Sequence, residues 1–282
     1  FPQLVAGPIE RTSNLLPQIK REQKFSEQKA FDGLKLMLWG YYKKLVVADT
    51  LAPYVDKVYN QLELYQGFSL MIVVFFFSLQ IYCDFSGYSD IAIGTARLFG
   101  IDLIKNFDAP YFSKSVKEFW RRWHISLSGW FREYLYIPLG GNRKGRARTC
   151  MNKMIVFACT GMWHGANVTF LFWGLFHGCF LMLEEFASVF QKEKIGWKKL
   201  AAHVYVILVV MIGFVFFRAD HMRQGMFWVF QMFAGMHFEN ASMRLVLSML
   251  TPVHLTAFAA GILASMPAME QLGQRKPMQK IL

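Results

Sequence analysis

A run of thirty residues without a formal charge, between Lys153 and Glu184, constrains this chain more than any other feature. The run is apolar enough to lie in hydrocarbon, and a helix of about 20 residues crosses a membrane core about 30 Å thick. Two histidines, His164 and His177, nevertheless lie inside it. Ionisable side chains are rare at membrane depth and mark functional sites there. The run therefore predicts a membrane protein with chemistry inside the membrane.

The composition supports a membrane protein and gives no support to nucleic-acid binding. Hydrophobic residues make up 54% of the chain and aromatic residues 17%, and the 31 basic and 19 acidic residues cluster outside the apolar runs. A net charge of +12 is compatible with nucleic acid, but no nucleic-acid motif accompanies it. In a membrane protein the same excess is the usual cytoplasmic bias of lysine and arginine.

Other apolar segments predict further membrane helices. The segments long enough to span are 67–83 with an extension toward 99, 200–217 and 243–266, whereas 226–236 is too short. The residues 84–90 are expected to bring polar groups to the end of the first of these helices. Within 31–60, Lys43 and Lys44 interrupt an apolar run, which we expect to lie at the interface or to dip partway into the membrane, with its lysines reaching water.

Residues 115–136 predict one amphipathic helix with a very aromatic face. Ser115 followed by Glu118 fits a capping box at its start. Seven large apolar residues, six of them aromatic, recur after it at helical spacing, namely Phe119, Trp120, Trp123, Leu127, Trp130, Phe131 and Tyr134. His124 borders this face, so we expect the helix to present it to interfacial water or to the protein interior.

Charge around the long run predicts its topology. Residues 140–153 carry five basic and no acidic residues, and 191–199 carry four basic and one acidic. Both segments should face the cytoplasm, so 154–190 is expected to form a hairpin or re-entrant pair that bends near Gly165–Asn167. Irregular backbone at membrane depth needs protein or a water-filled cavity around it. We therefore expect His164 to line a cavity.

The residues alone leave the role of His164 open between catalysis and an interhelical hydrogen bond. His177 lies between Gly174 and Gly178, where close helix packing favours a structural role. The two histidines would be about 20 Å apart on one continuous helix, and no Asp, Glu or Cys stands at ligand spacing from His164. No metal site is predicted. The four cysteines lack C-x-x-C spacing and are interpreted as small core residues (Cys83, Cys150, Cys159 and Cys179).

Several strings in this sequence resemble the membrane-bound O-acyltransferase family, and most closely its bacterial branch that acetylates alginate. They are A-G-P-I-E-R (6–11), Y-C-D-F-S-G-Y-S-D-I-A-I-G (82–94), E-F-W-R-R-W-H-I-S-L-S (118–128), Y-L-Y-I-P-L-G-G-N-R (134–143), G-M-W-H-G-A (161–166) and F-F-R-A (216–219). The resemblance runs from residue 1 to about 235. We therefore expect residues 1–282 to form a single membrane domain. Because the sequence starts at Phe1, we also expect further membrane helices N-terminal to it.

The resemblance implies an all-α polytopic fold, with transmembrane and re-entrant helices in a ring around a central funnel or tunnel. His164 matches the family's essential histidine, and His124 matches a second functional histidine. General-base chemistry on a hydroxyl suits a neutral imidazole, with His124 assisting by orienting a substrate or donating a hydrogen bond. Trp163 and Asn167 are candidate oxyanion donors. Trp163, Asn167, Asp84 and Arg122 are expected to line the tunnel.

The resemblance also implies a multi-pass protein of the bacterial inner membrane that transfers an acetyl group and binds no permanent cofactor. The donor is expected to be cytoplasmic acetyl-CoA or another acyl thioester, whose phosphates the basic loop 140–153 could meet. The acceptor is expected to be an extracytoplasmic polysaccharide or an acetyl-relay partner protein. Three alternatives stay open: D-alanyl transfer to teichoic acid from a carrier-protein thioester, a polytopic transporter, and a non-catalytic scaffold. The absence of a detectable internal repeat argues against the transporter.

Overall fold

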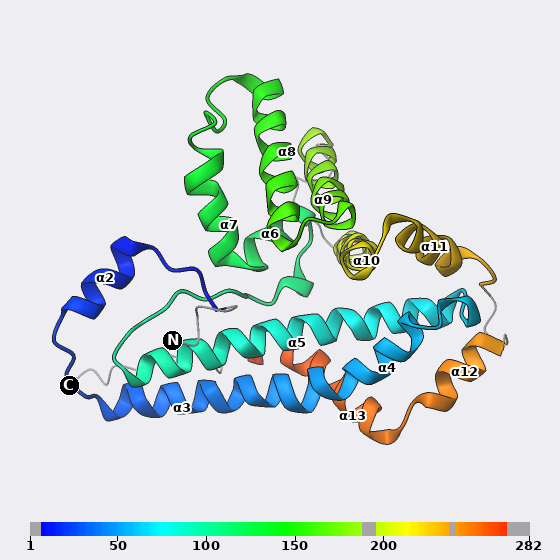
Figure 1. Ribbon diagram of the computed structural model, residues 1–282, viewed down its shortest axis with the longest axis horizontal. Helices are drawn as coiled ribbons and strands as arrows, with labels where there is room; N and C mark the ends of the chain where they lie inside the picture. Colours follow the sequence, from blue (N-terminus) through cyan, green and yellow to red (C-terminus); the bar gives the residue numbers. More distant parts are fainter. Residues whose placement is uncertain (1–6, 188–195, 237–240, 270–282) are drawn as a thin grey trace.

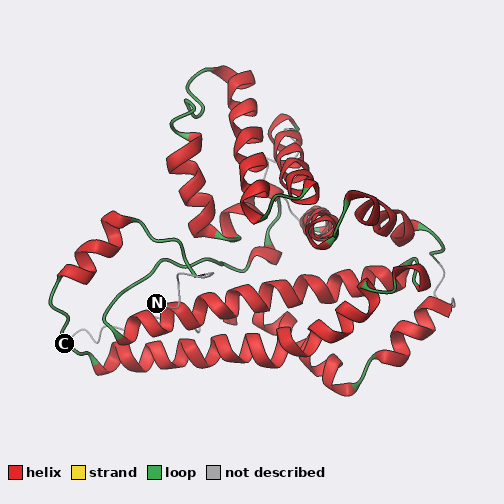
Figure 2. Cartoon of the chain, in the orientation of Figure 1, coloured by secondary structure: helices red, strands yellow, loops and turns green. Residues whose placement is uncertain are grey.

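The computed structural model describes residues 7–187, 196–236 and 241–269, and within these ranges it is helical with no strand (Figure 2). In chain order the elements are α2 (Thr12–Lys20), α3 (Glu27–Tyr41), the π-helix η1 (Tyr42–Ala48), α4 (Asp49–Tyr59), the 3₁₀ turn η2 (Leu62–Leu64), α5 (Phe68–Leu98), the 3₁₀ turn η3 (Pro110–Phe112), α6 (Val116–Arg122), α7 (Ile125–Phe131), the π-helix η4 (Arg132–Tyr136), α8 (Gly145–His164), α9 (Val168–Phe186), α10 (Trp197–Arg218), α11 (Met222–Phe233), α12 (Ala241–Met249) and α13 (Pro252–Ala264).

Three of the described helices, α5, α9 and α10, are long and apolar enough to cross a membrane. The pair α12–α13 makes a fourth candidate if the two are counted together. The predicted spans 67–99 and 200–217 are therefore confirmed as helices, and so is the all-α membrane class. The short segment 226–236 corresponds to α11, which has 12 residues.

Helices α3 and α5 lie side by side and antiparallel along the length of the molecule (Figure 1). Glycines permit the close approach: a Cβ on Gly33 or Gly40 would lie 2.6 Å from the carbonyl oxygen of Gly94 or Gly87, respectively. Small residues at such contacts are typical of membrane helices, where close backbone packing stabilises association. Gly87 and Gly94, which belong to the string 82–94, thus permit the close contact between α3 and α5.

Of the two lysines predicted to reach water, Lys43 does not. Lys43 is only 2% exposed, because its Nζ lies 2.6 Å from Asp90 Oδ2 on α5 and the side chain is enclosed between the helices. Lys44 is partly exposed and pairs with both Asp49 (2.9 Å) and Asp84 (2.6 Å). The polar residues 84–90 do not lie at the end of the helix as expected: α5 continues to Leu98, and Asp84 and Asp90 have lysine partners on the neighbouring π-helix.

The segment 243–266 is not the straight span that its length predicts. Helices α12 and α13 meet at a bend of 87°. Thr251 begins α13 by accepting a hydrogen bond from the backbone of His254, and Pro252 occupies its first position. Proline fixes its own backbone and disfavours a helical residue before it, so the chain turns here.

The prediction for the cysteines holds only in part. Cys83 on α5 is buried, but Cys179 on α9 is exposed, and Cys150 and Cys159 on α8 are half-buried. Cys150 and Cys159 lie on helix faces that the described residues cover only in part, and Cys179 lies on an uncovered face. The sequence could not distinguish these faces, because membrane helices are apolar on all sides.

Candidate active site

The predicted bend near Gly165–Asn167 is confirmed. Helix α8 ends at His164 and α9 begins at Val168. Gly165 has a φ of 158°, which favours glycine, and the Asn167 side chain caps α9 by accepting from Thr169 N at 3.1 Å. His164 is therefore placed at the break of a helical hairpin.

The two arms of the hairpin pack closely and return to the same end. A Cβ on Gly161 or Gly174 would lie 2.2 Å from the carbonyl oxygen of Phe170 or Phe157 in the opposite arm. At the open end Lys153 pairs with Glu185. The basic segment 140–153 and the end of α9 thus lie together at the open end of the hairpin, opposite its bend. The side of the membrane they face stays a prediction, and 191–195 fall outside the described residues.

His124 lies at a break in the helix that 115–136 was predicted to form. Ser115 caps α6 as expected, accepting from Glu118 N at 3.0 Å, although Glu118 accepts from Lys114 N rather than from Ser115. The helix then stops at Arg122, because Trp123 is extended and His124 adopts a left-handed conformation with a φ of 45°. The prediction of one continuous helix was wrong.

The two breaks bring His124 and His164 to one indole. The centroid of the Trp163 ring lies 6.0 Å from that of His124 and 5.0 Å from that of His164. His164 also packs against Trp173 at 5.2 Å and Phe217 at 5.0 Å. Trp163 is 54% exposed and His164 is half-buried, so the site is open to the surroundings.

His124 is the more enclosed of the two histidines. It is buried and packs edge-on against Phe85 of α5, with ring centroids 4.6 Å apart. It lies outside the candidate membrane spans, and burial, with a smaller contribution from His164, lowers the pKa of its imidazole to about 3. The ring is therefore neutral at physiological pH.

The other predicted tunnel residues have partners away from the two imidazoles. Asn167 Nδ2 donates to Asp220 O at 2.8 Å. Arg122 binds Glu118 Oε1 at 2.7 Å on its own helix, and Asp84 binds Lys44. Of the predicted set, the structure brings together His124, Trp163 and His164. A tunnel-lining role for Asp84, Arg122 and Asn167 stays a prediction.

His177 is placed as a packing residue, in agreement with its structural interpretation. It is 1% exposed and lies among aromatic rings, with Trp120 at 5.3 Å and Trp173 at 5.4 Å between centroids. A Cβ on Gly213 of α10 would lie 2.5 Å from its Nε2, so glycine is needed there.

Two supporting residues were missed from the sequence. Asn106 is buried and hydrogen-bonds to the residues that follow His124. Glu184, near the end of α9, is 4% exposed, and its carboxylate accepts from the backbone N–H groups of Val116 (2.5 Å) and Lys117 (3.0 Å) at the start of α6. Glu184 could have been recognised from the sequence, because a carboxylate in an otherwise apolar helix is unusual. The residues around Asn106 give no such indication.

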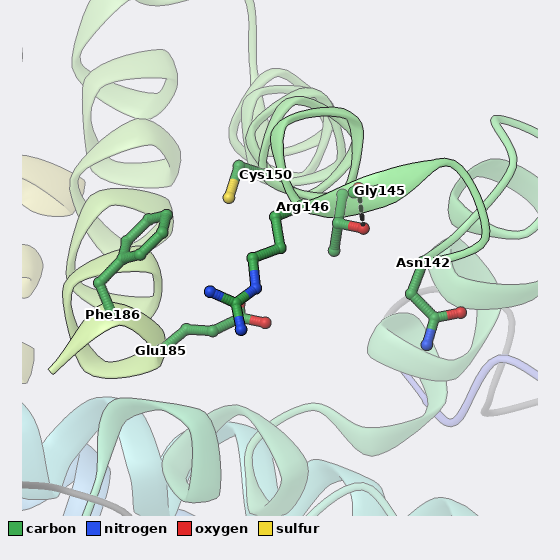
Figure 3. Close-up of a pocket in the computed structure, with 7 residues that line it drawn as sticks. Asn142, Gly145, Arg146, Cys150, Glu185 and Phe186 are labelled. Carbon is green, nitrogen blue, oxygen red and sulfur yellow. Dashed lines mark hydrogen bonds between the residues drawn. The ribbon is translucent and has the colours of Figure 1, made fainter. Parts of the chain in front are cut away.

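A cavity of about 550 Å³ lies at the open end of the hairpin, away from His164. Figure 3 shows Arg146 extending from the start of α8 into the space beside Glu185 and Phe186, with Asn142 across from them. Among the described residues no group of three or more His, Cys, Asp or Glu side chains is arranged to hold a metal ion.

The motifs and the hairpin geometry can be compared with known proteins. The sequence model of the membrane-bound O-acyltransferase (MBOAT) family matches residues 1–220. The chain belongs to this family. Its two imidazoles therefore lie in an MBOAT membrane domain, at the W-H-G and R-R-W-H motifs.

Named relatives cover most of this chain. It is 39% identical over 226 residues to the "probable alginate O-acetylase AlgI" of Azotobacter vinelandii, covering 79% of this chain and 44% of that protein. It is 38% identical to the peptidoglycan O-acetyltransferase of Helicobacter pylori, covering 80% and 44%. It is 26% identical to the teichoic acid D-alanyltransferase of Bacillus subtilis, covering 77% and 58%. The chain thus spans about half the length of these relatives.

Proposed function

We propose that this chain is the catalytic part of a membrane O-acetyltransferase that moves an acetyl group from a cytoplasmic thioester to an extracytoplasmic hydroxyl. The observation that carries the proposal is the contact of His124 and His164 with one indole, at two helix breaks, within an MBOAT domain. Family membership supports acyl transfer, and the similarity to alginate and peptidoglycan O-acetylating relatives supports acetyl as the group.

In the proposed reaction His164 acts as general base. One of its ring nitrogens takes the proton of the acceptor hydroxyl while the oxygen attacks the thioester carbonyl carbon. The tetrahedral intermediate collapses, the C–S bond breaks, and the thiolate recovers the proton from the imidazolium. General acid–base assistance of this kind contributes about 10²–10⁴-fold. His124 assists by orienting the acceptor or by donating a hydrogen bond.

The developing oxyanion needs a hydrogen-bond donor. Contacts favour Trp163 over Asn167 for this role. The Asn167 amide is engaged by Asp220 O, whereas the Trp163 indole is shared by both imidazoles and half-exposed. We infer that the Trp163 N–H faces the thioester oxygen in the complex.

Donor and acceptor are proposed to reach His164 from opposite sides of a bacterial inner membrane. Acetyl-CoA would approach from the side of the basic loop 140–153, whose charge suits its phosphates and also fits the cytoplasmic bias of membrane proteins. The acceptor would be a polysaccharide hydroxyl or the hydroxyl of a relay protein. A relay across the membrane gives a reason for placing the histidine at a re-entrant break.

The proposal is tested with the purified full-length protein, acetyl-CoA labelled on its acetyl group, and a polysaccharide or periplasmic fraction as acceptor. We expect label in an alkali-labile ester on the acceptor, and none when the thioester is replaced by labelled acetate. Label that crosses the membrane of a proteoliposome without forming an ester would contradict the proposal and favour a transporter.

The second candidate is D-alanyl transfer to teichoic acid, which the similarity to the Bacillus subtilis relative supports. The same purified protein is given a carrier protein loaded with labelled D-alanine as a thioester. The acetyltransferase proposal expects no transfer from this donor. Transfer from the D-alanyl carrier but not from acetyl-CoA would favour the second candidate.

A further inference from the structure

We propose that Asn106 is a positioning residue for the reaction, because it holds the turn that carries His124 against α5. The inference rests on the proposed function, in which His124 assists acetyl transfer. Asn106 lies in the connection between α5 and α6, is 1% exposed, and does not belong to any motif that pointed to the family.

The turn at His124 needs an external support. A φ of 45° is uncommon for a residue with a Cβ and persists only where the surrounding structure fixes it. Trp123 before it is extended, and the N–H of Ile125 after it donates to Asn106 O instead of to a carbonyl of the preceding helix. The direction of the imidazole is set by whatever holds this turn.

Asn106 supplies that support through both its backbone and its side chain. Its carbonyl oxygen accepts from Ile125 N at 2.9 Å. Its Oδ1 accepts from Ser126 N at 3.3 Å and from Ser126 Oγ at 2.5 Å. Its Nδ2 donates to Ser89 Oγ on α5 at 3.1 Å. One buried side chain thus joins the start of α7 to α5.

The position of the imidazole depends on this link. The His124 ring fits between Phe85 of α5 and Trp163 of α8, at centroid distances of 4.6 and 6.0 Å. Release of Ser126 from Asn106 would let the turn move relative to both rings. A displacement of about 1 Å in a catalytic constellation can cost about 10²-fold in rate.

The test is a double-mutant cycle in the purified full-length protein. Asn106→Ala, His124→Asn and the double variant are assayed for kcat and for KM of the thioester donor. Asparagine is chosen at position 124 because it tolerates the left-handed conformation without supplying an imidazole. We expect Asn106→Ala to lower kcat about 10- to 100-fold with little change in KM. In a protein that already carries His124→Asn, the same substitution should lower kcat by less than about 3-fold more.

Asn152 provides the matched control. It is as buried as Asn106. Its Nδ2 also holds a loop, by donating to Leu139 O and Gly141 O just before α8, at the end of the hairpin away from His164. Any loss caused by Asn152→Ala should be the same factor with or without His124→Asn, because that loss comes from general destabilisation. Coupling confined to Asn106 therefore separates positioning from a merely structural role.

The outcomes separate the inference from the proposed function. If Asn106→Ala and His124→Asn each lower kcat and the double variant loses the product of the two factors, only the inference about Asn106 would be overturned. A His124→Asn protein with wild-type kcat would contradict the role of His124 in the proposed function. If Asn106→Ala fails to insert into the membrane, Ser126→Ala removes its shortest bond, and the same cycle and criteria apply.

Discussion

The imidazoles of His124 and His164 both pack edge-on against the indole of Trp163, with interplanar angles of 75° and 86°. One histidine itself adopts the left-handed conformation between two short helices, and the other ends a long helix at a hairpin bend. Two irregular backbone segments from different motifs therefore meet at one side chain.

The shared indole predicts different effects for two substitutions of Trp163. Trp163→Phe keeps a ring between the histidines, whereas Trp163→Ala removes it together with the N–H donor. We expect kcat to fall about 10²-fold or more in Trp163→Ala, on the scale of a lost oxyanion donor. If the N–H is the donor, Trp163→Phe should lose nearly as much. Because Trp163 is half-exposed, neither variant should lower Tm appreciably. Wild-type kcat in Trp163→Phe would exclude the indole N–H as the oxyanion donor.

The burial of His124 predicts a dependence of stability on pH. The folded-state pKa of about 3 lies below the ordinary value near 6.5, so the unfolded chain binds the proton first as the pH falls. The contribution of His124 to stability is complete above about pH 6.5 and is lost toward acid, by up to about 1.4 kcal/mol per pH unit.

His124→Asn should remove this contribution. We expect Tm in detergent to fall less between pH 7 and pH 5 in this variant than in the wild type. His221→Asn, at an exposed histidine, is the control and should keep the wild-type fall. An unchanged acid-induced fall in His124→Asn would show that His124 is not a buried neutral group.

The close hairpin predicts that Gly174 cannot carry a side chain. Its Cβ would meet the backbone oxygen of Phe157 at 2.2 Å, and backbone cannot move aside as a flexible side chain can. Overpacking of this kind typically costs about 1–3 kcal/mol, so Gly174→Ala should lower Tm and reduce activity. Gly129→Ala is the control, since its Cβ would meet only the guanidinium of Arg11 at 3.0 Å. Equal Tm values for the two variants would contradict this packing.

The ion pair between Lys43 and Asp90 predicts a large and selective loss of stability. Lys43→Met leaves a largely enclosed carboxylate without its partner, which costs about 3–5 kcal/mol in buried pairs. Lys44→Met breaks partly exposed pairs and should cost less than about 1 kcal/mol. Denaturation of the two variants in detergent measures the difference. Similar losses would mean that Lys43 is solvated in the membrane protein.

Length and hydropathy were enough to predict the regular parts of this fold. Helices α5 and α10 and the α8–α9 hairpin follow from apolar runs and their basic flanks, and the glycine near His164 marked the bend. These features are local, so the sequence near each of them contains the cause. The motifs likewise identified His124 and His164 as the candidate pair.

The parts that were predicted wrongly depend on partners distant in the sequence. The helix break at His124 is held by Asn106 and Ser89, and Lys43 is buried because Asp90 comes from another helix. The apolar pattern of 115–136 continues across the break, since α6 and α7 each bury part of it. Such pairings are set by tertiary packing, which periodicity does not report.

The most direct measurement of the central claim is single-turnover acetyl transfer by the full-length protein with His164→Ala, beside the exposed-histidine variant His221→Ala. We predict that His164→Ala inserts into the membrane and keeps a Tm within about 2 °C of the wild-type value, which corresponds to about 0.5 kcal/mol. Its rate of transfer should nevertheless fall by at least about 10²-fold. His221→Ala should transfer at the wild-type rate. A well-folded His164→Ala protein that still transferred acetyl groups at a near-normal rate would contradict the account.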